Sequence, residues 1–213
     1  MSLNRWIHPQ YVEMYNKGTL KDLASDLPFL HAVLPHFLSE EALSMVLLHS
    51  QTQKVERAHG KGVASRADWH WGAFSQLEFI KFYLGKEMRS FMSQLLGEEV
   101  HLKASSVPQF NIFKPNSKGL PLHTDLCEQV GFVSLLQLSE GYDLGSGGEL
   151  IFYGQEGQKI VPSRVVEPRM NTFILFKVSS RSFHSVTDMK GSWTRRTISY
   201  DWFGREQLRA NHG

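Results

Sequence analysis

Three side chains in this sequence have the types and the order of a mononuclear metal site. His123 and Asp125 are two residues apart, and if their segment is a strand, both side chains leave the same face. His184 offers a second imidazole further along the chain. Two imidazoles and one carboxylate on one face of an octahedron leave three positions open, a set that favours Fe(II) binding a cosubstrate together with O₂. We therefore expect His123, Asp125 and His184 to be the metal ligands.

The motifs around these residues strengthen the hypothesis, because an isolated His-x-Asp pair arises easily by chance among ten histidines and 21 acidic residues. Gly147–Leu150 reads Gly-Gly-Glu-Leu, His184 lies in a Phe-His-Ser-Val segment, and Arg195–Ser199 opens another strand with a basic residue. In this order the motifs resemble the Fe(II)/2-oxoglutarate-dependent oxygenase superfamily, in particular its prolyl-hydroxylase-like branch. The similarity runs roughly from Phe29 to Phe203, most of the chain.

The resemblance implies a dioxygenase that hydroxylates a C–H bond and releases succinate and CO₂. Its cofactors would be Fe(II), 2-oxoglutarate as cosubstrate and O₂, with ascorbate as a supporting reductant. The substrate would be a small molecule, an amino acid or a peptidyl side chain. Halogenating members of the superfamily lack the carboxylate ligand, so the presence of Asp125 points to hydroxylation or a related oxidation.

Arg195 is the residue that we expect to pair with the distal carboxylate of 2-oxoglutarate, since a guanidinium can hold a carboxylate through two parallel hydrogen bonds. In the family this basic residue lies on the strand after the second histidine, and a hydroxyl residue often follows two positions later, as Thr197 does here. Ser199 continues the same face. Arg196 points the other way on a regular strand, but a bulge would exchange the two arginines. Both could also be surface charges.

One position departs from the family pattern. Many relatives place a tyrosine on the strand before His-x-Asp, where its hydroxyl helps to hold 2-oxoglutarate. The matching position here is Phe113, which has no hydroxyl. Asn111 or Gln109 is expected to supply the polar contact instead.

Other reactive side chains have less specific roles. Cys127 either borders the metal pocket or is a small buried hydrophobe, and the second interpretation is favoured. Glu149 is expected to orient its turn or a neighbouring strand and not to bind metal. His31, His70 and His101 are expected to be surface or core histidines.

The composition is that of one globular domain. The chain has 213 residues, of which 41% are hydrophobic and 21% charged, with a formal net charge of +2. This charge is too small to indicate a nucleic-acid partner, and no basic run tracks a phosphate backbone. Cys127 is the only cysteine, so an intramolecular disulfide is excluded, which suits the cytoplasm that we expect. Neither a signal peptide nor a membrane span is expected.

We predict a single oxygenase domain over residues 1–213, in three parts: an N-terminal extension (1–28), a helical support region (29–99) and a jelly-roll core (100–204). The fold class is mainly β with flanking helices (α+β), a double-stranded β-helix backed by N-terminal helices. Many short strands with turns at regular spacing favour two four-stranded sheets. The expected core strands cover 107–113, 123–127, 131–138, 149–153, 161–168, 171–178 and 194–203.

The N-terminal half carries the helical signals. Tyr11–Tyr15 fits a short helix and Phe29–Val33 a strand, and Ser39 is a plausible cap for a helix that starts with two acidic residues. Residues 52–72 resemble a loop or an edge hairpin. This segment ends in the aromatic cluster Trp69–Trp71. The favoured interpretation is that the cluster packs over the next helix; the alternative is a substrate-facing flap.

The strongest helix signal spans Ser75–Leu96, where an apolar stripe of Met and Phe side chains has helical period and belongs in the core. Gly97 follows as a C-terminal stop.

Two other functions compete with hydroxylation. A nucleic-acid demethylase of the same superfamily would need a basic groove and a second arginine about six residues after Arg195, where Asp201 and Trp202 are poor matches. A jelly-roll module that binds metal or sugar without oxidation would give Arg195 no special purpose.

Overall fold

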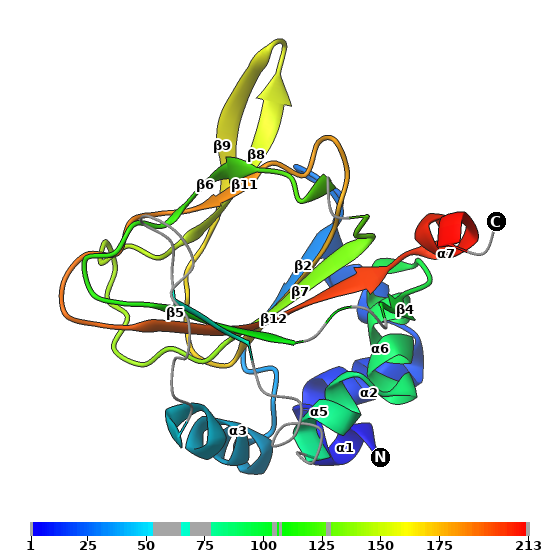
Figure 1. Ribbon diagram of the computed structural model, residues 1–213. Helices are drawn as coiled ribbons and strands as arrows, with labels where there is room; N and C mark the ends of the chain where they lie inside the picture. The colour runs from blue at the N-terminus through cyan, green and yellow to red at the C-terminus, as the bar shows by residue number, and fades with distance from the viewer. Residues whose placement is uncertain are drawn as a thin grey trace.

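The described residues of the computed structural model are 2–52, 65–68, 78–103, 106, 108–126 and 129–211. They form two antiparallel β-sheets that face each other, with the helices on the outside of one sheet (Figure 1). The predicted α+β jelly roll backed by N-terminal helices is thereby confirmed.

The larger sheet has eight strands in the order β1-β2-β10-β7-β12-β5-β3, with β4 paired to β12. The bounds are β1 Ala24–Ser25, β2 His31–Leu34, β3 Ser65–Asp68, β4 His101–Leu102, β5 Gln109–Phe113, β7 Phe132–Gln137, β10 Thr172–Lys177 and β12 Arg195–Phe203.

The smaller sheet has four strands in the order β6-β11-β8-β9. The bounds are β6 Leu120–His123, β8 Leu150–Glu156, β9 Lys159–Val166 and β11 His184–Val186. The prediction of two four-stranded sheets is therefore wrong for the larger one. Four neighbouring strands, β10, β7, β12 and β5, form the centre of the larger sheet, and β1, β2, β3 and β4 extend it.

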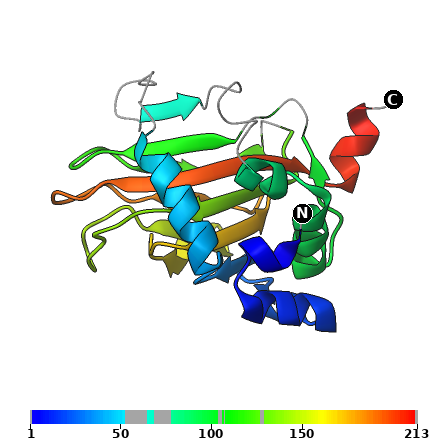
Figure 2. The same ribbon diagram turned by 90° about the horizontal axis from the view of Figure 1, so that it is seen from below.

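The helices cover the outer face of the larger sheet, as seen from below in Figure 2. These helices are α1 Leu3–Trp6, α2 Pro9–Lys17, the 3₁₀ helix η1 Leu20–Leu23, α3 Glu40–Thr52, α5 Glu78–Tyr83 and α6 Lys86–Leu96. The last helix, α7 Arg205–Asn211, lies past the end of β12 at the side of the sheet (Figure 1). Within the described ranges, none of these helices has the length and apolar character needed to cross a bilayer.

Both faces of the larger sheet are buried, which explains its nearly continuous apolar strands. On β12, Ile198, Tyr200 and Trp202 point to the helices and belong to one hydrophobic cluster. Arg195 and Thr197 alternate with them and face the space between the sheets. Burial of each large apolar side chain stabilises the fold by about 1.5–3 kcal/mol. A shift of β12 by one residue would expose these side chains to the cavity, so the alternation fixes the register that points the polar residues inward.

The helix predicted over Ser75–Leu96 is interrupted in the structure. α5 ends at Tyr83, and Gly85 is extended (φ −73°, ψ 170°) at the N-cap of α6. A Cβ on Gly85 would lie 2.8 Å from the carbonyl oxygen of Lys81 and 2.9 Å from that of Phe82. Only glycine allows the two helices to meet this closely. The apolar residues keep their helical spacing on both sides of Gly85, so the hydrophobic pattern does not indicate the break.

The remaining N-terminal predictions agree with the structure to within a few residues. α2 contains the segment expected to be helical, and β2 lies two residues later than the predicted strand at its start. Ser39 caps α3, because its hydroxyl accepts a hydrogen bond from the backbone N–H of Ala42 at 3.3 Å. Gly97 is left-handed (φ 68°) and ends α6 as predicted.

The segment 52–72, expected to be a loop or an edge hairpin, is described only in part. Within it, β3 pairs with β5 at the edge of the larger sheet. The aromatic cluster at Trp69–Trp71 and the position of Cys127 lie outside the described ranges.

Candidate metal site

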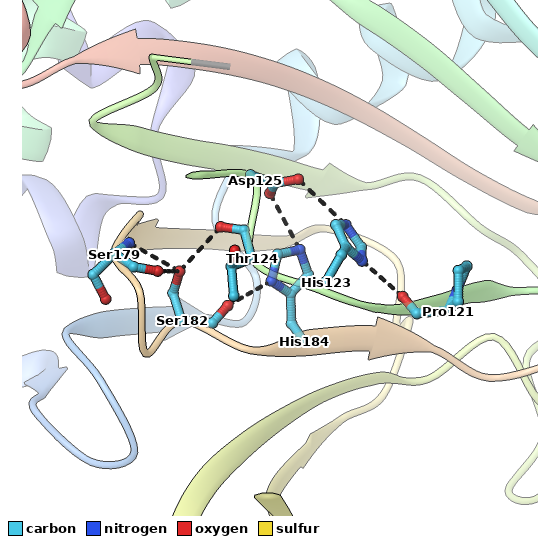
Figure 3. A network of polar contacts seen from close by, with 7 residues as sticks. All are labelled: Pro121, His123, Thr124, Asp125, Ser179, Ser182 and His184. Carbon is cyan, nitrogen blue, oxygen red and sulfur yellow. Dashed lines mark hydrogen bonds and ion pairs between the residues drawn. The ribbon is translucent and has the colours of Figure 1, made fainter. Parts of the chain in front are cut away.

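His123, Asp125 and His184 converge at one place between the sheets (Figure 3). Nε2 of His123 lies 3.3 Å from Oδ1 of Asp125, and Nε2 of His184 lies 3.2 Å from Oδ2. β6 and β11 pair with His123 directly opposite His184, so strand pairing brings the two imidazoles together. The predicted triad is present.

The backbone at Asp125 differs from the prediction. β6 ends at His123, and Asp125 has a left-handed backbone with φ 57°. Side chains two apart on a regular strand would stand parallel, about 6.6 Å apart. The turn instead places the carboxylate between the two rings, and aspartate tolerates this backbone region better than most residues. The expectation that both side chains leave one strand face is therefore wrong.

Backbone carbonyls fix both imidazole rings. Nδ1 of His123 donates to the carbonyl oxygen of Pro121 at 2.7 Å, and Nδ1 of His184 donates to that of Ser182 at 2.9 Å. The hydroxyl of Ser182 also lies 3.2 Å from the carbonyl oxygen of Thr124, which links the segments that carry Asp125 and His184. Sequence analysis missed Pro121 and Ser182, and the only common signal is their position two residues before each histidine.

These contacts determine which atoms face the centre. With the hydrogen on Nδ1, each Nε2 carries a lone pair that points at a carboxylate oxygen of Asp125. Three electron-pair donors thus lie within 4.8 Å of one another, which requires a cation between them or protonation of the rings. The donor set, with its ring tautomers held by carbonyls, fits a divalent transition metal.

Electrostatics at Asp125 agree with this arrangement. Burial alone would raise the pKa of its carboxyl, but hydrogen bonds and positive charge from His123 and His184, in their protonated form, outweigh burial and hold the pKa below its usual range. The carboxylate is therefore charged and available as a ligand at neutral pH.

A cavity of about 240 Å³ extends from the triad along the inner face of the larger sheet. Its apolar lining residues are Phe113, Leu120, Val133, Leu135, Leu150, Phe176 and Val186. The ring of Phe176 packs edge-on against His184, with centroids 4.9 Å apart. Such an apolar lining lowers the local dielectric constant and so strengthens polar interactions inside the cavity.

Arg195 lies in this cavity, only 2% exposed. Its guanidinium stacks over the ring of Phe113 at 5.1 Å, and its buried Nε has no hydrogen-bond partner in the described structure. Burial lowers the pKa of Arg195 to about 10. A Cβ on Gly148 would lie 3.1 Å from Cδ of Arg195, so the second glycine of Gly-Gly-Glu gives the arginine room.

The other residues predicted to hold the cosubstrate lie in the same cavity. Thr197, Ser199 and Asn111 all line it, and Nδ2 of Asn111 donates to Oγ of Ser199 at 2.8 Å. Arg196 is half-buried and is not among the lining residues.

Glu149 is engaged in structure, as expected. Its carboxylate accepts hydrogen bonds from the hydroxyls of Tyr142 and Thr187, and its backbone N–H donates to Oγ1 of Thr187 at 3.0 Å. These contacts tie the start of β8 to the residue that follows β11. His31 and His101 do not line the cavity.

Comparison with known proteins gives a family for the region that contains the site. Residues 108–204 match the model of the 2OG-Fe(II) oxygenase superfamily. The chain is 25% identical over 189 residues to mouse prolyl 3-hydroxylase OGFOD1, covering 83% of this chain and 33% of that protein. It is 25% identical over 235 residues to prolyl 3-hydroxylase sudestada1 of Drosophila melanogaster, covering 94% and 40%. The chain thus spans between a third and two fifths of the length of these relatives.

Solved structures share the fold. A prolyl hydroxylase from Trichoplax adhaerens, in complex with a hypoxia inducible factor peptide fragment, superposes with a TM-score of 0.67 at 17% identity, covering 94% of this chain and 95% of the other. A prolyl 4-hydroxylase from Pseudomonas putida gives 0.63 at 20% identity, covering 87% and 98%.

Proposed function

We propose, since residues 108–204 place this chain in the 2OG-Fe(II) oxygenase superfamily, that it hydroxylates a prolyl residue of a peptide or protein. The balanced reaction takes the substrate C–H, O₂ and 2-oxoglutarate to C–OH, succinate and CO₂. The observation that carries the proposal is the convergence of two imidazole Nε2 atoms and one carboxylate within 4.8 Å.

In this proposal His123, Asp125 and His184 hold Fe(II), which supplies the redox chemistry that no side chain can perform. The protein fixes the ligands in advance: carbonyls orient both rings, and the turn at Asp125 sets the carboxylate between them. Ligands held in this way need little rearrangement when the metal binds.

Arg195 is proposed to receive the distal carboxylate of 2-oxoglutarate. A buried guanidinium stacked on Phe113, with no acidic partner in the described structure, is a ready partner for an anion. Thr197 lies next to it on the same strand face, and the Asn111–Ser199 pair supplies the polar groups that the family tyrosine would provide.

A prolyl substrate is supported by the names of the two relatives described above, both prolyl 3-hydroxylases. The apolar walls of the cavity suit a pyrrolidine ring, which has no charge and no N–H within a chain. An amino acid or another small molecule is the alternative substrate. A cytoplasmic location and a supporting role for ascorbate stay predictions.

The carboxylate of Asp201 argues against the demethylase alternative. Asp201 lines the cavity six residues after Arg195, where a basic residue would favour a phosphate backbone. A carboxylate there repels phosphate, because like charges at close range are unfavourable.

The test is anaerobic titration of the purified protein with Fe(II) and 2-oxoglutarate, followed by an oxidation assay. Binding of 2-oxoglutarate to the protein-bound Fe(II) is expected to give a weak visible absorption band at about 500 nm. A panel of proline peptides is then incubated in air, and mass spectrometry records the addition of one oxygen atom together with succinate. Oxidised free amino acids with unmodified peptides would reassign the substrate, and absence of the band would contradict the proposal.

Two variants make the assignment specific. His123→Ala is expected to abolish the band, because one of the three protein ligands is lost. Arg196→Ala is the matched control for Arg195→Ala: only the latter is expected to raise the concentration of 2-oxoglutarate needed for half-saturation. If Arg196→Ala has the larger effect, the assignment of the cosubstrate arginine is wrong.

A further inference from the structure

We propose that Asp201 selects the substrate: its carboxylate receives a cationic group, an ammonium or a guanidinium, that lies close to the oxidised C–H bond. The inference rests on the proposed function and deepens it, since it names the chemistry that a substrate must carry beside its prolyl residue.

Asp201 occupies the end of the cavity opposite to Arg195. Both belong to β12, and Arg195, Thr197, Ser199 and Asp201 all line the cavity at every second position. At about 3.3 Å per residue, six residues separate the two charges by roughly 20 Å along the strand. Arg195 is buried, whereas Asp201 is partly exposed, so the aspartate lies nearer to solvent.

Strand register places Asp201 level with the metal ligands. Asp201 pairs with Val133 of β7, and Val133 pairs with Phe176 of β10. These three residues form one row across the larger sheet, and all three line the cavity. The ring of Phe176 contacts His184 at a centroid distance of 4.9 Å. Neighbouring strands are about 4.8 Å apart, so Asp201 lies roughly 10 Å across the sheet from Phe176.

This position is where a substrate must lie. The cosubstrate occupies the stretch between the metal and Arg195, because its two ends bind there. A C–H bond presented to the metal therefore approaches from the side of Asp201, and the groups next to that bond meet its carboxylate.

The charges in the cavity make a cation the complementary ligand. Among the described residues, the acidic ones in the lining are Asp125 and Asp201, and Asp125 is one of the proposed metal ligands. Asp201 has an interaction within the chain, but a carboxylate offers about four lone-pair positions and can accept further hydrogen bonds. A neighbouring cation is attracted and an anion repelled in a cavity partly screened from water. The partner is thus a lysine or arginine near the proline, or an α-ammonium group.

The experiment uses synthetic peptides that differ in one residue. A single proline is flanked, at each position in turn, by lysine, its uncharged analogue norleucine, or glutamate; free proline and a peptide with proline at its free N-terminus test the α-ammonium source. Affinity is measured anaerobically by calorimetry on the full chain loaded with Fe(II) and 2-oxoglutarate, and oxidation is measured separately in air. The variants are Asp201→Asn, Asp201→Lys and, as control, Glu156→Gln on the exposed end of β8.

The expected result is about tenfold tighter binding of the best lysine peptide than of its norleucine counterpart, a typical effect of one partly buried charge pair. Asp201→Asn should reduce this ratio to near one, and Asp201→Lys should favour glutamate, while Glu156→Gln keeps the original ratio. A preference for free proline or the N-terminal peptide that Asp201→Asn removes would identify the α-ammonium as the source.

The inference is overturned if lysine and norleucine peptides bind equally and neither free proline nor the N-terminal peptide shows a preference that Asp201→Asn removes. It is also overturned by a lysine preference that survives Asp201→Asn. If both Asp201 variants lose the visible band of the Fe(II)–2-oxoglutarate complex while Glu156→Gln keeps it, Asp201 is structural and the inference also fails. Peptides that bind with the expected charge preference but gain no oxygen would instead contradict the proposed function and leave the role of Asp201 standing.

Discussion

Replacing Arg195 with methionine should weaken cosubstrate binding and, at the same time, stabilise the protein in the absence of ligand. The guanidinium is 2% exposed, and in the described structure it has the ring of Phe113 as its partner and no acidic residue. A buried cation without a counter-ion is unfavourable, so the residue is retained at the expense of stability. A residue kept for structural reasons would behave in the opposite way.

The magnitude follows from the burial of the charge. Desolvation lowers the pKa of Arg195 from 12.5 to about 10, which at 1.36 kcal/mol per pKa unit corresponds to roughly 3 kcal/mol. The cation–π contact offsets about 1 kcal/mol of this. Methionine fills a similar apolar volume without the charge. We expect R195M to raise the free energy of unfolding of the ligand-free protein by about 1–2 kcal/mol.

The assay has two arms. Urea unfolding without metal or 2-oxoglutarate gives the free energy of unfolding, and anaerobic titration gives the dissociation constant of 2-oxoglutarate. Loss of a buried charge-assisted pair is worth about 2–5 kcal/mol, so R195M should bind 2-oxoglutarate at least about 30-fold more weakly. R196M serves as the control and should change neither quantity appreciably.

Two outcomes would refute the reasoning about Arg195. If R195M lowers the free energy of unfolding by more than about 2 kcal/mol, the guanidinium holds the fold together through contacts that outweigh its desolvation. If R195M leaves the dissociation constant of 2-oxoglutarate within a factor of about two, the carboxylate binds elsewhere, whatever the stability does.

Three further predictions concern the metal, a glycine and a buried histidine. Adding Fe(II) anaerobically at 100 times its dissociation constant should stabilise the wild type by about 2.7 kcal/mol and leave His123→Ala unchanged in thermal unfolding; equal stabilisation of both would contradict metal binding at the triad. Gly148→Ala should lose about 1–3 kcal/mol of stability, because Gly148 has φ 78° and its added Cβ would lie 3.1 Å from Cδ of Arg195; urea unfolding measures this, and an unchanged midpoint would contradict the packing. Burial lowers the pKa of His31, despite the hydrogen bond to the carbonyl oxygen of Phe29. Below about pH 6.5 the unfolded chain therefore binds a proton at this histidine that the folded chain does not bind, and the free energy of unfolding decreases as the pH falls. His31→Phe should therefore show a shallower decline of unfolding free energy between pH 7 and 5, by up to about 1.4 kcal/mol per pH unit, and parallel curves for the two proteins would contradict the assignment.

Local chemistry explains what could be predicted from the sequence. The alternation along β12 separates residues that need apolar neighbours, such as Trp202, from polar ones such as Thr197, so pattern alone indicates which side chains face the cavity. The metal ligands follow from donor types that few other functions require together. In both cases the prediction depends on the types of the side chains that line the cavity or bind the metal, and these can be read directly from the sequence.

Non-local contacts explain what could not be predicted. The addition of β3 and β4 to the larger sheet depends on pairing with strands far along the chain, and segments of four and two residues carry little signal for such pairing. The break at Gly85 depends on carbonyls of the preceding turn, since an isolated glycine within a helical pattern is often tolerated.

The groups that orient the triad show why residue types alone do not indicate every part of a site. Both imidazoles donate to a backbone carbonyl two residues earlier, at Pro121 and at Ser182. Every residue has a carbonyl, so neither position needs a particular side chain to make this contact. The left-handed backbone of Asp125 is likewise set by where its carboxylate must end, between two rings that strand pairing brings together. A sequence can therefore specify which atoms bind the metal and still leave the geometry of binding to the backbone, which only the folded chain reveals.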